Sequence, residues 1–180
     1  MYTLTHVEPA ASKYVLYQQI CEQLQQLLGE EQDFIANAAN TAALLFHMLP
    51  DVNWVGFYTA EGDELVLGPF QGKPACARIP LGKGVCGTAA QQQRTIVVPD
   101  VNRYPGHIAC DTASQSEIVV PLLNWGKFLG VLDIDSASLN RFDEDDKDGI
   151  ESAVSVFLAS QATNEPPDLT DEAAEDCPPS

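Results

Sequence analysis

Just after Pro50, the spacing of apolar residues changes from a helical repeat to alternation, and this change limits the folds open to the chain. Before Pro50, two amphipathic segments at 12–28 and 32–48 carry apolar residues three or four positions apart, as helices do. After Pro50, short segments alternate as half-buried strands do. A last helix is expected from Phe142 or Asp143, where four consecutive acidic residues favour a helix N-terminus. This order of elements predicts an α+β domain.

The middle of the chain supplies the strands. The first two candidate strands are separated by the turn-rich sequence Ala-Glu-Gly-Asp and the last two by Asn-Trp-Gly, which favours antiparallel hairpins. A short helix is expected at 84–93 and a long loop at 100–115; long loops inside a domain are often functional. We therefore expect a central six-stranded antiparallel sheet, with strands at 53–59, 64–70, 76–80, 95–99, 116–123 and 127–135.

The length of 180 residues suits one domain with short extensions. We assign residues 1–12 to an N-terminal extension and 13–161 to the folded domain. Residues 162–180 are rich in Pro, Glu and Asp and contain no basic residue, a composition that predicts a disordered acidic tail.

Net charge and hydropathy exclude several functions. Nine Lys and Arg residues stand against 26 Asp and Glu residues, giving a net charge of −17 that repels nucleic acids and anionic lipid surfaces. No apolar run reaches the roughly 18 residues of a membrane-spanning helix, and the N-terminus does not resemble a secretory signal. We expect a cytoplasmic protein with neither nucleic acid nor membrane as a partner.

Alternation within three strands places aromatic and acidic side chains on one side of the sheet, opposite the apolar core. Solvated carboxylates are the ordinary alternative, but Asp133 and Asp135 follow the apolar run FLGVL, where a covered strand is expected. The pattern therefore predicts a ligand pocket in which one or more of the enclosed acids have a raised pKa. Its expected residues are Trp54, Gly56 and Tyr58 opposite Val55 and Phe57, Asp133 and Asp135 opposite Phe128, Leu132 and Ile134, and Glu117 opposite Ile118, Val120 and Leu122.

Five irregularly spaced cysteines predict free thiols rather than a disulfide framework. We interpret Cys21, on the first helix, as a structural residue. We interpret Cys177, in the tail, as incidental. Cys86 falls at the expected N-terminus of the short helix, a position that lowers a thiol pKa. Cys110 lies in the long loop, and Cys76 precedes it. A thiol redox site therefore spans 76–110.

Zinc is an alternative for the same segment. His107, Cys110, Cys76 and Cys86 offer four ligands in principle. Structural zinc usually takes its ligands from paired short spacings, which Cys76 and Cys86 lack. A redox trio of thiols suits the irregular spacing better, so we expect no bound metal.

From about Tyr14 to Ala159, the chain resembles the free methionine-(R)-sulfoxide reductases, a family of GAF domains. The resemblance rests on the three cysteines within their motifs together with the carboxylate motifs. These motifs are NWVGFY at 53–58, LVLGPFQGKPAC at 65–76, IPLGKGVCGTAA at 79–90, VPDVNRYPGHIACD at 98–111, SEIVVPL at 116–122 and GVLDIDS at 130–136.

The resemblance implies reduction of free methionine (R)-sulfoxide by a single GAF domain. The domain's N- and C-terminal helices are expected on one face of the sheet and its pocket on the other. The nucleophile would be Cys110, the resolving thiol Cys76 and an auxiliary thiol Cys86, although the order of attack by the cysteines stays open. The reductant implied is thioredoxin, no organic cofactor is needed, and a homodimer is compatible with the family. The pocket residues implied are Glu117, Asp133 and Asp135 as carboxylates, with Glu117 as the first choice of proton donor, and Trp54 and Tyr58 as an aromatic wall.

A second function class fits the same residues. Many GAF domains bind small ligands or sense redox state without turnover. Such sensors are normally joined to an output domain, whereas only a short acidic tail follows the last helix here, so we favour the enzyme.

Overall fold

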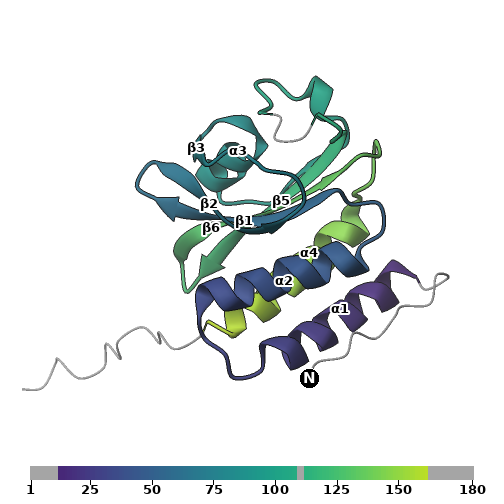
Figure 1. The fold of residues 1–180 in the computed structure, drawn as a ribbon. Helices are drawn as coiled ribbons and strands as arrows, with labels where there is room; N and C mark the ends of the chain where they lie inside the picture. The colour runs from purple at the N-terminus through teal and green to yellow at the C-terminus, as the bar shows by residue number, and fades with distance from the viewer. Residues whose placement is uncertain (1–11, 109–111, 162–180) are drawn as a thin grey trace, which may run out of the picture.

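The computed structural model describes residues 12–108 and 112–161 (Figure 1). Nearly all of the predicted N-terminal extension, the predicted acidic tail with Cys177, and Cys110 lie outside these residues.

Three of the helices begin at side chains that cap them. In α1 (Lys13–Leu28), the Ser12 side chain accepts a hydrogen bond from the backbone of Val15. Asp33 caps α2 (Phe34–Met48), which therefore starts two residues later than the apolar pattern suggests. In α4 (Glu144–Ala159), Asp143 and Asp146 form a capping box. The acidic run that predicted this helix thus also fixes its first residue.

The six-stranded antiparallel sheet is confirmed, with the spatial order β3-β2-β1-β6-β5-β4. The first hairpin turns tightly at Gly62, whose φ is positive, and the second at Trp125 and Gly126. The expected strands at 76–80 and 95–99 are shorter than predicted, and a 3₁₀ turn, η1 (Val101–Arg103), interrupts the long loop. The strands are β1 (Trp54–Glu61), β2 (Glu64–Gln71), β3 (Arg78–Pro80), β4 (Ile96–Val98), β5 (Ser116–Asn124) and β6 (Lys127–Ser136).

Helices cover the two faces of the sheet unequally. On one face α2 and α4 pack against the strands and α1 packs outside them, as Figure 1 shows. On the other face α3 (Gly84–Gln92) packs against β5 and β6. One apolar cluster fills each side, which confirms the predicted separation of helical face and pocket face. None of the helices in the two described ranges is long and apolar enough to cross a bilayer.

The assignment of Phe128 to the helical face was wrong. Phe128 packs with the pocket-side cluster, and Leu129 packs with the helix-side cluster instead. The cause is an irregularity in the β5–β6 pairing, where Leu122 pairs with Gly130 but Leu123 pairs with Phe128. One extra residue in a strand reverses the side of every residue beyond it.

Asp146 joins α4 to α1 and to the chain before α4. Its buried carboxylate accepts hydrogen bonds from the Tyr17 hydroxyl at 2.8 Å and from Arg141 at 2.9 Å. Lys13 donates at 2.6 Å. Beside this cluster, Gly149 lets the helices approach closely, because a Cβ there would overlap the Tyr17 ring. The contact between α1 and α4 therefore depends on one buried carboxyl group with three side-chain donors.

Replacing Asp146 by alanine should lower the free energy of unfolding by about 3 to 5 kcal/mol, because Arg141 is left buried without its partner. Chemical denaturation measures this change. Asp148→Ala is the matched control on an exposed position of the same helix and should have little effect. Equal effects of the two substitutions would contradict the role given to Asp146.

Candidate active site

Strand register brings three carboxylates together on the pocket face. Glu117 of β5 lies directly opposite Asp135 of β6. Asp133, two residues before Asp135, is on the same side of β6 and pairs with Gly56 of β1. All three are only 5% exposed. The alternative of solvated carboxylates is therefore excluded for these residues.

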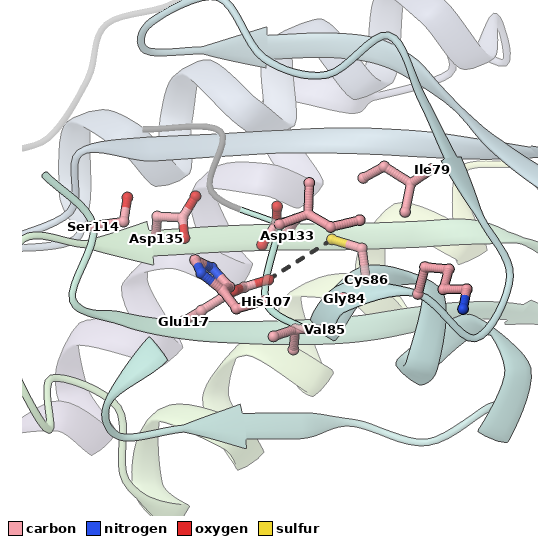
Figure 2. A pocket seen from close by; sticks show the side chains of 11 residues that line it. Ile79, Gly84, Val85, Cys86, His107, Ser114, Glu117, Asp133 and Asp135 are labelled. Carbon is pink, nitrogen blue, oxygen red and sulfur yellow. Dashed lines mark hydrogen bonds and ion pairs between the residues drawn. The ribbon is translucent and has the colours of Figure 1, made fainter. Parts of the chain in front are cut away.

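Cys86 lies above the carboxylates because α3 crosses this part of the sheet. Its Sγ donates a hydrogen bond to Glu117 Oε1 at 3.8 Å, drawn as a dashed line in Figure 2. Gly84, at the first position of α3, has a positive φ and faces the Ile108 side chain. A Cβ at this position would press on Ile108, so the glycine allows the turn into α3 to fit against the loop.

Burial, not the helix N-terminus, controls the acidity of Cys86. Burial raises the pKa of the thiol well above its ordinary value, and the nearby Asp133 and Glu117 add to the rise. The expectation of a lowered pKa was wrong for Cys86, because α3 packs this thiol against the acidic residues of β5 and β6. In this state Cys86 is a neutral thiol.

Two of the three carboxylates, those of Glu117 and Asp133, show the raised pKa values that their enclosure predicts. Burial is the main cause for Glu117, and repulsion from Asp135 adds to it. Burial likewise raises the pKa of Asp133, with repulsion from Glu117 second. Acids held protonated in this way can donate protons at neutral pH.

His107 reaches the site from the long loop, which sequence spacing did not show. Its Nε2 lies 3.4 Å from Glu117 Oε2. Burial lowers the pKa of His107 while it raises that of Glu117, so a neutral imidazole beside a neutral carboxylic acid fits better than an ion pair. Ser114, held by Asn53 through a 3.1 Å hydrogen bond, lines the same pocket. The sequence indicated His107 only as a possible zinc ligand, and its only signal for Ser114 was the length of the loop.

The pocket that these side chains enclose is small. Its cavity volume is about 10 Å³, the room of roughly one water molecule. Ile79 and Val85 supply part of its apolar wall, as Figure 2 shows. Lys83 also lines the pocket. Any larger ligand must displace part of this lining.

Trp54 and Tyr58 bind the segment that carries Cys76. The Trp54 indole donates to the carbonyl of Lys73 and the Tyr58 hydroxyl to the carbonyl of Cys76, both at 3.0 Å. The two rings stack with centroids 6.0 Å apart. Neither belongs to the lining of the small pocket among the described residues. Their predicted contact with substrate stays a prediction, and the structure adds a positioning contact to Cys76.

Tyr58→Phe should loosen the Cys76 segment while keeping the ring stack. Loss of one hydrogen bond worth about 0.5 to 1.5 kcal/mol should speed thiol modification of Cys76 by roughly two- to tenfold. Mass spectrometry after timed alkylation measures this rate. Tyr14→Phe, at an exposed tyrosine on α1, is the control. An unchanged Cys76 rate in Tyr58→Phe would contradict the contact.

A family model for the GAF domain matches residues 15–161. The chain belongs to the GAF-domain family. Protein YtsP of Bacillus subtilis is 57% identical over 145 residues, covering 79% of this chain and 89% of that protein. Free methionine-R-sulfoxide reductase of Escherichia coli is 47% identical over 154 residues, covering 86% of this chain and 93% of the reductase.

The fold agrees with this kinship. The X-ray structure of free methionine-R-sulfoxide reductase from Neisseria meningitidis in complex with its substrate matches this GAF domain with a TM-score of 0.84. The two are 44% identical, and the match covers 89% of this chain and 96% of the other. The resemblance to the reductase family is therefore confirmed in both sequence and fold.

The predicted nucleophile, Cys110, falls outside the described residues, so its place relative to the carboxylates stays a prediction. Next to β5, which begins at Ser116, the Gln115 backbone N–H is not free to bind a substrate carboxylate, because it donates to the carbonyl of Ser136 at 2.7 Å. The first turn of α3, with Gly84, Val85 and Cys86 in the pocket wall, is the better placed donor group.

Proposed function

We propose that this protein reduces free methionine (R)-sulfoxide to methionine. The observation that carries the proposal is the enclosed group of a thiol and three carboxylates, two of them with raised pKa values, in a chain 47% identical to such a reductase. A sulfoxide oxygen leaves only when it gains protons, so a reductase needs acids that remain protonated at neutral pH. Glu117 has this property and faces the pocket.

The reaction proceeds in three balanced steps. The Cys110 thiolate attacks the sulfoxide sulfur and the oxygen gains one proton; the S–O bond then breaks, the hydroxyl group passes to the Cys110 sulfur to give a sulfenic acid, and methionine leaves. The Cys76 thiol then condenses with the sulfenic acid, which forms a disulfide and releases water. A dithiol donor, thioredoxin, reduces the disulfide by exchange and becomes oxidised itself. Cys86 acts as an auxiliary thiol in this exchange.

The remaining pocket groups orient the substrate. Glu117 protonates the departing oxygen, and His107 at 3.4 Å holds that carboxyl group. Asp133 and Asp135 bind the substrate ammonium group, and the first turn of α3 receives its carboxylate. Trp54 and Tyr58 contact the substrate once the pocket widens toward β1. Resting thiols require a reducing compartment, which fits the cytoplasm.

The test is a coupled assay with racemic free methionine sulfoxide, thioredoxin, thioredoxin reductase and NADPH. NADPH consumption should stop when half of the sulfoxide, the R isomer, is used. Binding of the sulfoxide without NADPH consumption would favour a ligand-sensing module and overturn the enzyme proposal. Consumption of the S isomer alone would contradict the pocket assignment.

A further inference from the structure

The pocket gathers a sulfur atom and two carboxylate oxygens closely enough to share one ion. Ligand atoms of Cys86, Glu117 and Asp133 all lie within 4.8 Å of one another, and each residue is only 5% exposed. The three residues come from α3, β5 and β6, so the fold, and not a local sequence motif, brings them together. Figure 2 shows the Cys86 sulfur beside the carboxylates of Glu117 and Asp133, with a dashed line to Glu117.

One oxygen of this group has no hydrogen-bond partner. Oδ1 of Asp133 is buried and accepts no hydrogen bond from any described residue. A buried polar atom without a partner costs about 1 to 3 kcal/mol, so a ligand that satisfies Oδ1 of Asp133, such as an ion, is favoured there. Among the described residues, the pocket lining includes two basic side chains, Lys83, which is exposed, and His107, whose pKa is lowered by burial so that the neutral imidazole is favoured. The position of Asp133 therefore favours a cationic ligand.

We propose that the reduced pocket binds one thiophilic divalent cation, of the Zn²⁺ or Cd²⁺ class, through Cys86, Glu117 and Asp133. Zn²⁺ binds sulfur at about 2.3 Å and carboxylate oxygen at about 2.0 to 2.2 Å, so its tetrahedral ligands lie roughly 3.5 Å apart. The Cys86 Sγ to Glu117 Oε1 distance of 3.8 Å is close to that spacing. A thiol with two carboxylates suits these metals better than Mg²⁺ or Ca²⁺, which prefer oxygen ligands alone.

A fourth ligand is close at hand. His107 Nε2 lies 3.4 Å from Glu117 Oε2, and imidazole is a common zinc ligand. This set differs from the zinc site considered from the sequence, which relied on Cys76 and Cys110. The ion is an inhibitor here, because it occupies the acids that the substrate requires; this part of the inference rests on the proposed function.

Metal binding is tested directly on the reduced full-length protein. Titration with Cd²⁺ should give a cadmium–thiolate absorbance band that saturates at one ion per chain. Cys86→Ser should abolish the band, and Asp133→Asn should weaken Cd²⁺ binding by about 10- to 100-fold, the usual loss when a metal site is disturbed. Glu117→Gln is a second ligand variant in case one of these fails to fold, which circular dichroism shows.

Cys21→Ser and Cys76→Ser are the matched controls, since both remove a thiol outside the proposed ligand set. Both should keep the band and its affinity. The proposal is overturned if Cd²⁺ binding survives in Cys86→Ser, or if it depends on Cys76 and not on Asp133.

The inhibitory role is tested in a single turnover without thioredoxin, whose own thiols bind metals. Zn²⁺ should slow methionine release from the reduced protein, and excess sulfoxide should restore the rate. If the sulfoxide is not reduced even without metal, the proposed function fails while the cadmium titration still decides the metal site. Methionine release at an unchanged rate in saturating Zn²⁺ would overturn the inhibition.

Discussion

Replacing Cys110 by serine is expected to abolish methionine sulfoxide reduction, because a serine hydroxyl is not ionised at neutral pH and forms no sulfenic acid. The loss should reach the detection limit of the coupled assay, since no other step can start without the first attack. Thermal unfolding should be nearly unchanged, which separates loss of the nucleophile from loss of the fold. Residual turnover at a substantial fraction of the original rate would show that another thiol makes the first attack.

Cys76→Ser separates the two halves of the same reaction. If Cys76 is the resolving thiol, this variant should release about one methionine per chain in a single burst and then stop. The trapped sulfenic acid is detected by mass spectrometry after reaction with dimedone. Continued turnover with thioredoxin would instead assign the resolving role to Cys86, and Cys21→Ser, in the helical core, provides the control.

Glu117→Gln should lower kcat by about 10² to 10⁴, the usual contribution of a general acid. The amide keeps the shape and one hydrogen bond of the side chain but cannot release a proton to the departing oxygen. Steady-state kinetics with free methionine sulfoxide measures the change, and KM should change less than kcat. Glu30→Gln, at an exposed glutamate, is the control. An unchanged kcat would indicate that Asp133 or Asp135, and not Glu117, is the proton donor.

The same substitution should stabilise the fold at neutral pH. Because the pKa of Glu117 is raised in the folded state, the native protein binds this proton more tightly than the unfolded chain does. Stability is then greatest below the ordinary glutamate pKa of 4.5 and falls as pH rises through the raised pKa. A glutamine at position 117 does not ionise, so the variant avoids this loss of stability. It also removes the repulsion between Glu117 and Asp133 that contributes to the raised pKa of Asp133. The difference in Tm between Glu117→Gln and the original protein should therefore grow from pH 5 to pH 8.

If the difference in Tm between Glu117→Gln and the original protein does not grow with pH, Glu117 ionises as easily in the folded protein as in the unfolded chain. Loss of activity with a gain in stability is the combination expected where a fold holds acids together for chemistry. A purely structural Glu117 predicts the opposite sign, since its removal would lower Tm at every pH.

Local sequence patterns determined the elements and most of the side-chain directions. Alternation with a period of two fixes which residues of a strand share a side, and so it placed Glu117, Asp133 and Asp135 opposite the helical core. It failed at Phe128, where an irregular pairing with β5 changes the side. Pairing irregularities depend on the neighbouring strand and leave no dependable mark in the strand's own pattern.

Only tertiary structure decided the environment of the thiol and of the aromatic residues. A helix N-terminus suggested an acidic Cys86, yet the docking of α3 on β5 and β6 buries this thiol among carboxylates and raises its pKa. Folding also brings His107 into contact with Glu117. It also lets Trp54 and Tyr58 donate hydrogen bonds to the backbone of the segment that carries Cys76. Periodicity is a property of neighbours in sequence and can be read there, whereas desolvation and charge repulsion depend on groups that are far apart in sequence and meet only in the folded domain.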